Sequence, residues 1–457
     1  MLAKGSGTTK THGILDTPGR KKPTLRTYWG LAGKRRKSPE KAEYFARASK
    51  FLTRSEAIKH VQRFALCLFF FSINFEALDP FSTNGFFSVS KLTGLIYLIT
   101  IIPQVRYLNR ADIRNPFLQP IWFFFGILTL VSLININVIS YNFFDFTIFQ
   151  NIFLFWLLFN HERKDRLVLE KGMLSFALGS FFLSLLFFAG IGIEYDGGRV
   201  SIFGDNPNSI GLRMSISLTI LILAIVQNRL KFGRLRYILL LLIPIMIQLM
   251  VETGSRVALI SFALAFVTGV VLFKTKKVLG KIAVFAVGAI AIICFLIFLT
   301  QSEILTQRLL ISYMEGDLAG RDIIWERLLS LIESNPIFGV GETGYAYFSQ
   351  ITFGEETSPH NVILEVICYT GFVGLIVYLT FLYRILRRGY QNYKKDGFLL
   401  QLLLLIPVFG ILVSGQILYQ KIGWVIFAYI VGSSVYKSKS ETVVRINAHT
   451  YENYVEG

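Results

Sequence analysis

The sequence contains few charged residues and very little cysteine. Only 17% of its 457 residues are Asp, Glu, Lys or Arg, whereas 53% are hydrophobic, and the mean hydropathy is +0.53. These values exclude an ordinary soluble domain and are typical of polytopic membrane proteins. The cysteines Cys67, Cys294 and Cys368 all fall within apolar runs, so neither a disulfide framework nor a cysteine zinc motif is expected.

Two further motifs are missing. The sequence has no Gly-x-x-x-x-Gly-Lys-Ser/Thr segment, which argues against ATP coupling by a P-loop. It also has no Asp-x-Asp motif of the kind that holds a metal in nucleotide-sugar transferases. The segment Glu315-Gly316-Asp317 is only a loose variant of that motif. We therefore expect no metal site and no cofactor.

The formal charge of +18 is unevenly distributed. Much of the excess lies in residues 1–62, for which we predict a disordered, basic cytoplasmic tail that contacts anionic membrane lipid. Most of the remainder lies in short loops, as in membrane proteins whose basic loops face the cytoplasm. This distribution does not indicate nucleic-acid binding. Residues 437–457 are predicted to form a cytoplasmic C-terminal tail.

Apolar runs of about 17 to 25 residues, the length that a helix needs to cross a bilayer, follow one another from residue 63 to residue 436. They predict an all-α polytopic membrane protein with about 12 transmembrane helices. The predicted spans are 63–79, 86–105, 117–135, 142–159, 172–193, 207–226, 236–251, 256–273, 281–300, 361–383, 398–414 and 419–436.

Every second connection between these spans is rich in Lys and Arg, as in the loop with Arg229, Lys231, Arg234 and Arg236. Because such loops stay in the cytoplasm, both termini are predicted to be cytoplasmic. The one long polar segment, 301–359, is then predicted to form a large extracytoplasmic loop containing short helices.

This loop contains a segment with the apolar spacing of a helix, and a histidine follows its last residue. Apolar residues between Ile323 and Ile332 predict a one-sided helix that ends at Asn335-Pro336. A flexible return path through three glycines is expected to follow, and His360 then precedes a new apolar run. The glycines are Gly339, Gly341 and Gly344.

Other charged residues are predicted at the same outer ends of the spans. Arg199 precedes the turn Gly204-Asp205-Asn206-Pro207-Asn208, and Arg213 lies inside the next span. Arg256 begins the span 256–273. Charge inside or beside a membrane is costly, so it usually faces a cavity or a partner. Asp145, in the predicted span 142–159, has no evident role.

Several segments in this region resemble the bacterial O-antigen ligase/polymerase family, and their order and spacing make the resemblance specific. They are Asn206-Pro207-Asn208, Thr253-Gly254-Ser255-Arg256, Arg321 with Trp325, Asn335-Pro336-Ile337-Phe338-Gly339-Val340-Gly341, Pro359-His360-Asn361-Val362-Ile363-Leu364-Glu365 and Thr370-Gly371-Phe372-Val373-Gly374-Leu375.

The resemblance implies a glycosyltransferase in the bacterial inner membrane. Such proteins move a glycan from an undecaprenyl pyrophosphate carrier to a glycan or lipid acceptor, and polysaccharide-assembly proteins are possible partners. The essential residues of the family fall here on Arg256, Arg321 and His360.

The chemistry of these residues agrees with that role. Guanidinium groups hold pyrophosphate oxygens through paired hydrogen bonds and stabilise the charge of the leaving group. A helix N-terminus disfavours an imidazolium, so His360 is expected to be neutral and to act as a general base. The mechanism is expected to be independent of metal.

Alternatives remain at this stage. Arg256 could be an interfacial anchor, Arg321 a solvated partner of Asp322, and His360 a solvent-facing residue. Arg199, Arg213 and Glu365 are candidate substrate-binding residues, and structural pairing explains each of them equally well. A transporter or flippase of lipid-linked sugars is the alternative function, although the clustering of charge at one face favours an enzyme. Polymerase and ligase are not distinguished.

Overall fold

The computed structural model describes residues 39–83, 87–108, 115–137, 139–273 and 320–433, with a few positions between 293 and 310. The chain divides into two compact units, Met1–Ala57 and Ile58–Gly457. The second unit contains every element considered below, apart from the first part of one helix.

The described part is mostly helical. Its first half contains α2 (Pro39–Ser72), η2 (Ile73–Phe75), α3 (Val89–Leu108), α4 (Leu118–Ile134), α5 (Phe146–Lys164), α6 (Val168–Phe188), β1 (Ile193–Asp196), β2 (Arg199–Ile202) and α7 (Pro207–Gln227). The rest contains η3 (Gly233–Leu241), α8 (Leu242–Glu252), α9 (Arg256–Leu272), α12 (Arg321–Ser334), α13 (Gly341–Phe353), α14 (Val362–Asp396), α15 (Leu400–Leu403), α16 (Leu405–Ser414) and α17 (Lys421–Gly432).

A helix lies at each predicted span except 281–300, which falls almost entirely outside the described residues. Four segments among those described are long and apolar enough to cross a membrane: Val168–Phe188, Pro207–Gln227, Gly233–Glu252 and Val362–Asp396. The remaining apolar helices are shorter, so the count of about 12 spans stays a prediction.

Helix α2 begins earlier than the sequence led us to expect. It starts at Pro39, within the predicted disordered tail, so residues 39–62 are helical. Proline is favoured at the first position of a helix, and the Ala, Glu, Lys and Arg residues that follow are strong helix formers. Residues 1–38 of the predicted tail lie outside the described part.

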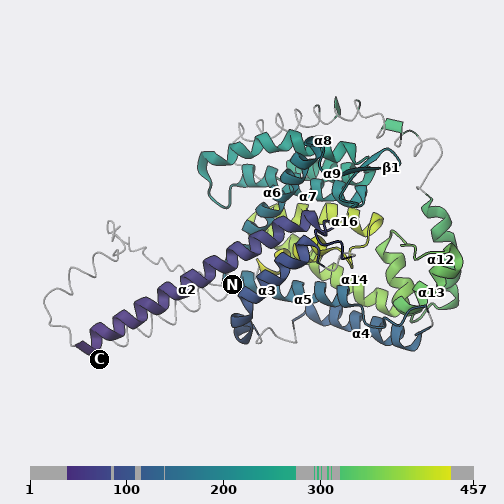
Figure 1. The fold of residues 1–457 in the computed structure, drawn as a ribbon, viewed down its shortest axis with the longest axis horizontal. Helices are drawn as coiled ribbons and strands as arrows, with labels where there is room; N and C mark the ends of the chain where they lie inside the picture. The colour runs from purple at the N-terminus through teal and green to yellow at the C-terminus, as the bar shows by residue number, and fades with distance from the viewer. Residues whose placement is uncertain are drawn as a thin grey trace, which may run out of the picture. The chain divides into compact units, whose positions relative to one another are not determined.

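Helix α7 occupies the middle of the second unit. It packs against α6, α8, α9 and α16, and α16 also contacts α14 and α17. A second group forms where α14 packs on α4 and α17 packs on α5 (Figure 1). Apolar side chains along the middle of α7, such as Met214, Ile216 and Leu218, are fully buried.

A short hairpin interrupts the helices, which corrects the all-α prediction. Strands β1 and β2 are antiparallel, with Glu194 opposite Ser201 and Asp196 opposite Arg199. The turn between them uses Gly197 and Gly198, whose positive φ values of 55° and 78° suit a tight hairpin. The hairpin packs on α7 through β2 and so places Arg199 beside the start of that helix.

Helix α14 is broken at Gly371, which has φ 62° and ψ −166°. The loop between α12 and α13 fills the break. The amide of Phe372 donates to Pro336 O at 2.8 Å, and the amide of Val373 donates to Ile337 O at 3.2 Å. The Pro336-Ile337 backbone thereby satisfies amides that the broken helix leaves without helical partners.

The predicted flexible return path through the loop glycines is wrong. A Cβ on Gly339 would lie 2.5 Å from Cys368 O, and one on Gly341 would lie 2.5 Å from Ser132 Cα. Both glycines also have positive φ, at 66° and 71°. They are therefore close-packing positions, at which only glycine allows the loop to approach α14 and α4.

Candidate active site

Four polar residues, three of them from the sequence motifs, cap helices. Asp145, Asn206, Ser255 and Asn361 are the N-caps of α5, α7, α9 and α14, and each side chain accepts a hydrogen bond from a backbone amide of its helix. Part of the motif pattern is therefore structural, because Asp, Asn and Ser are the preferred N-cap residues. The cap also gives Asp145, whose role the sequence left open, a definite function.

His360 immediately precedes the cap of α14, as predicted. It is half-buried, and its backbone amide donates to Ser358 Oγ at 3.1 Å. Its φ of 49° lies in the left-handed region, which is unusual for a residue other than glycine. Such backbone strain is found disproportionately at functional sites.

The structure brings Arg321 to His360. Burial lowers the pKa of His360 below its ordinary value, and the positive charge of Arg321 lowers it further. The same helix, α12, reaches the His360 turn through Trp325, whose Nε1 donates to Pro359 O at 2.9 Å. The expectation of a neutral imidazole thus gains support, although from burial and Arg321 rather than from the helix dipole.

Arg256 belongs to a second group, at the start of α9. It follows the cap Ser255 directly and is half-buried. The turn before it packs tightly on α7, since a Cβ on Gly211 would lie 2.8 Å from both Ser255 Cβ and Thr253 Oγ1. Arg199 joins this group, because its Nε donates to Thr253 O at 2.9 Å and its Nη2 to Asn208 Oδ1 at 2.7 Å.

Arg213 lies deep in α7 and is 4% exposed. It forms an ion pair with Asp205, and its Nη1 donates to Ile73 O at 3.1 Å. These contacts tie α7 to the turn before it and to η2. They fit the structural alternative for Arg213 better than substrate binding.

Contacts around the start of α17 connect the two groups. Gln420 Nε2 donates to Ser209 Oγ at 3.4 Å, beside the Arg256 group, and the hydroxyl groups of Tyr419 and Tyr369 lie 3.4 Å apart. Tyr369 lies in the first part of α14, at the end of the helix that His360 precedes. The N-terminal ends of α7, α9, α14 and α17 therefore gather at one end of the unit.

Buried carboxyl groups of separate helices influence one another near the start of α14, an arrangement that the sequence did not reveal. Glu365, in the first turn of α14, is only 1% exposed, and neither of its carboxylate oxygens accepts a hydrogen bond from the described protein. Burial raises the pKa of Glu342, and the charges of Asp145 and Glu365 raise it further. No sequence signal joins these residues, because they come from three separate helices.

No three His, Cys, Asp or Glu side chains in the described ranges are grouped so that they could hold a metal ion. A buried carboxyl group is stable only when protonated or when given hydrogen-bond donors.

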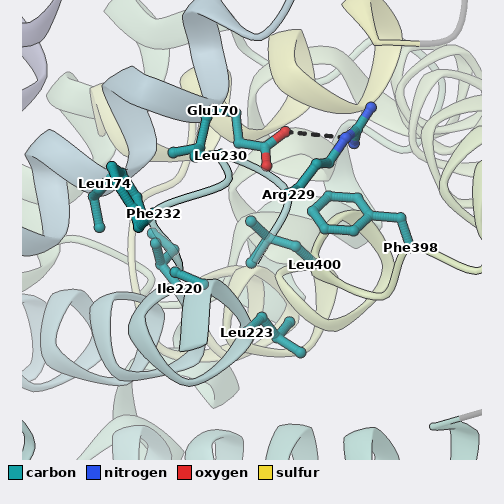
Figure 2. A pocket seen from close by; sticks show the side chains of 10 residues that line it. Glu170, Leu174, Ile220, Leu223, Arg229, Leu230, Phe232, Phe398 and Leu400 are labelled. Carbon is teal, nitrogen blue, oxygen red and sulfur yellow. Dashed lines mark ion pairs between the residues drawn. The ribbon is translucent and has the colours of Figure 1, made fainter. Parts of the chain in front are cut away.

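A pocket lies at the opposite end of α7. Its polar groups are Glu170 and Arg229, which form an ion pair at 3.4 Å, and Arg229 also lies 4.4 Å from the centre of the Phe398 ring. Figure 2 shows this pair at the edge of an otherwise apolar lining. Because the two charges already face each other, the pocket offers less for catalysis than the His360 end.

The fold and the site define a mostly helical protein that has segments long and apolar enough to cross a membrane and Arg and His residues gathered at one end of its helices. A family profile described as O-antigen ligase matches residues 239–379. The matched region is similar to the O-antigen ligase family, in agreement with the resemblance seen in the sequence. The match includes Arg256, Arg321, His360 and Glu365, and it leaves out Arg199 and Arg213. No curated protein matches the chain.

Proposed function

We propose that this protein transfers a glycan from an undecaprenyl pyrophosphate carrier to an acceptor hydroxyl at the outer face of the bacterial inner membrane. The observation that carries the proposal is that the charge of Arg321 acts on His360, while Trp325 of the same helix donates to Pro359 O beside it. The two residues come from separate motifs of the matched region. Together they offer a cation and a neutral base at one place.

In the proposed reaction, His360 takes the proton of the acceptor hydroxyl as its oxygen attacks the anomeric carbon of the donor glycan. The bond from that carbon to the pyrophosphate oxygen breaks, and its electron pair leaves with the carrier. Arg321 and Arg256 stabilise the negative charge that develops on the pyrophosphate. The new glycosidic bond contains the acceptor oxygen, and undecaprenyl pyrophosphate is released.

Arg199 is proposed to support Arg256 by holding Thr253, and Glu365 is proposed to contact the bound glycan. We propose that the reaction needs no metal, because the sequence has no Asp-x-Asp motif of the kind that holds one. In this proposal both termini are cytoplasmic and residues 301–359 lie outside. The transporter alternative is not favoured, because the matched family consists of ligases and polymerases and not of transporters.

The test uses a strain that lacks this protein, complemented with wild type, His360→Asn or His360→Ala. Asparagine tolerates positive φ, so His360→Asn removes the base with the least added strain. Surface glycans are separated by size on a gel. Loss of long chains with single repeats still attached identifies a polymerase, and long chains that stay on the carrier identify a ligase. A wild-type ladder in both variants, at normal protein levels, overturns the catalytic assignment.

A further inference from the structure

The indole of Trp325 is a side-chain donor that joins α12 to the His360 turn. Its Nε1 donates to Pro359 O at 2.9 Å, and Pro359 is bonded directly to His360. Arg321 lies four residues before Trp325 on α12, so the two side chains are neighbours on one helix face. This hydrogen bond therefore links the turn that carries His360 to the helix face that carries Arg321.

The turn itself needs support from outside. His360 has a φ of 49°, and a strained residue keeps such a conformation only when its surroundings hold it. Two helices of the loop provide this support from different sides. Trp325 of α12 holds Pro359 O, and the hydroxyl of Tyr345 on α13 donates to Thr357 O at 2.6 Å.

We propose that Trp325 is a positioning residue, which holds Arg321 and His360 in register through its hydrogen bond to Pro359 O. The inference rests on the proposed function for the role of the two residues, but the geometric claim can be measured separately. Trp325 does not touch the reacting atoms in this proposal. Its effect passes through the turn.

Packing alone does not explain Trp325. Helix α12 already has an apolar anchor in Leu328, which is fully buried, while Trp325 is only half-buried. A phenylalanine would keep most of the ring contact and would lose the N–H donor. The rest of α12 would then stay attached, while its first turn could move away from Pro359. A displacement of about 1 Å in a catalytic group can reduce a rate by about 100-fold.

The experiment uses the whole protein in detergent and compares wild type with Trp325→Phe. Diethyl pyrocarbonate modifies neutral imidazole, so the pH dependence of His360 modification, followed by mass spectrometry, reports the pKa of this residue without relying on activity. We expect this pKa to rise toward the ordinary value of about 6.5, because burial and the influence of Arg321 both decrease. We also expect kcat to fall by about 10- to 100-fold.

Arg321→Ala should raise the pKa of His360 in the same way. If Trp325 acts by placing Arg321, the double variant should then show little further rise, because both substitutions remove the same interaction. Fully additive shifts, or an unchanged pKa and kcat in Trp325→Phe, would overturn the proposal. A protein with benzothienylalanine at position 325, which keeps the ring shape without the N–H, replaces Trp325→Phe if that variant does not accumulate.

Trp122→Phe is the matched control. Trp122 is also half-buried, and its described contacts are to the rings of Phe125 and Phe149. It should leave the pKa of His360 and kcat unchanged. Failure of the proposed function is distinguishable, since it would appear as activity retained in His360→Asn, whatever Trp325→Phe does.

Discussion

Arg213 and Arg321 are the same residue type in two very different settings. Arg213 sits inside a helix packed on several sides, is 4% exposed and pairs with Asp205. Arg321 is the first residue of a loop helix, is half-buried and acts on His360. The charge of Arg213 is balanced by Asp205 inside the protein, whereas the charge of Arg321 acts on a candidate base. What surrounds an arginine, more than its motif, separates a structural role from a catalytic one.

The largest effect expected from this comparison is on activity. His360→Asn should reduce glycan transfer by about 100- to 10,000-fold, the usual contribution of a general base. The thermal midpoint of the purified protein should change little, because the side chain is only half-buried. Transfer assayed with purified carrier-linked glycan, together with a melting curve, checks both parts. A large loss of stability would instead show that His360, like Arg213, has a structural role.

Arg213→Ala should show the opposite profile, with loss of stability preceding any specific loss of activity. Removing it leaves Asp205 without its ion-pair partner near the interior, which costs about 3 to 5 kcal/mol for a buried pair. Protein yield and denaturant unfolding in detergent measure this. Arg213→Gln combined with Asp205→Asn should recover part of the stability, since it removes both charges together. If Arg213→Ala has normal stability, the structural role is wrong and the substrate-binding role of Arg213 is favoured.

Gly371→Ala tests how firmly the loop is fixed to α14. The new Cβ would lie 2.2 Å from Ile337 O at a φ of 62°, so the loop must shift and the backbone becomes strained. Strain of this kind costs about 1 to 3 kcal/mol. Gly126→Ala on α4 is the matched control, because no atom lies within 4 Å of its Cβ position. Equal thermal midpoints for the two variants would show that the contact at Gly371 is not needed.

The smallest effect concerns pH. The pKa of Glu342 is raised in the folded protein, so folding takes up a proton at this group. Its contribution to stability is complete below the ordinary carboxyl pKa of about 4 and is lost as the pH rises through the higher folded value. Glu342→Gln should flatten the decline of the thermal midpoint with rising pH. An unchanged slope would show that Glu342 titrates normally.

The sequence predicted the helices well where one local pattern decides the structure. Apolar runs predicted where helices lie in the described part, and Asn335-Pro336 correctly ended the helix that the structure shows as α12. Its apolar face was only partly right. Ile324 and Leu328 face the protein, whereas Ile323 and Leu329 are 61% and 53% exposed, because helix periodicity alone cannot say which neighbours will be present.

Most of the features that the sequence missed depend on contacts between distant segments, and the β1–β2 hairpin is the local exception. The β1–β2 hairpin has no strong alternating pattern, and the close approach of Gly339 to Cys368 is decided by two segments about 30 residues apart. The carboxyl groups of Glu342 and Glu365 lie about 200 and 220 positions after Asp145. The pairing of Arg321 with His360 was expected only from the family resemblance, because no local rule brings a helix start to a turn 39 residues away.

The seam between Pro336-Ile337 and the broken helix has a practical consequence for anyone who wishes to dissect this protein. The loop from α12 to α13 is not a detachable module, since its backbone carbonyls complete the hydrogen bonding of α14. A soluble fragment of residues 320–360 would lack the helix against which it folds, and a chain without the loop would open at Gly371. Inhibitor screening and antibody selection against this site therefore require the intact protein in a membrane mimetic.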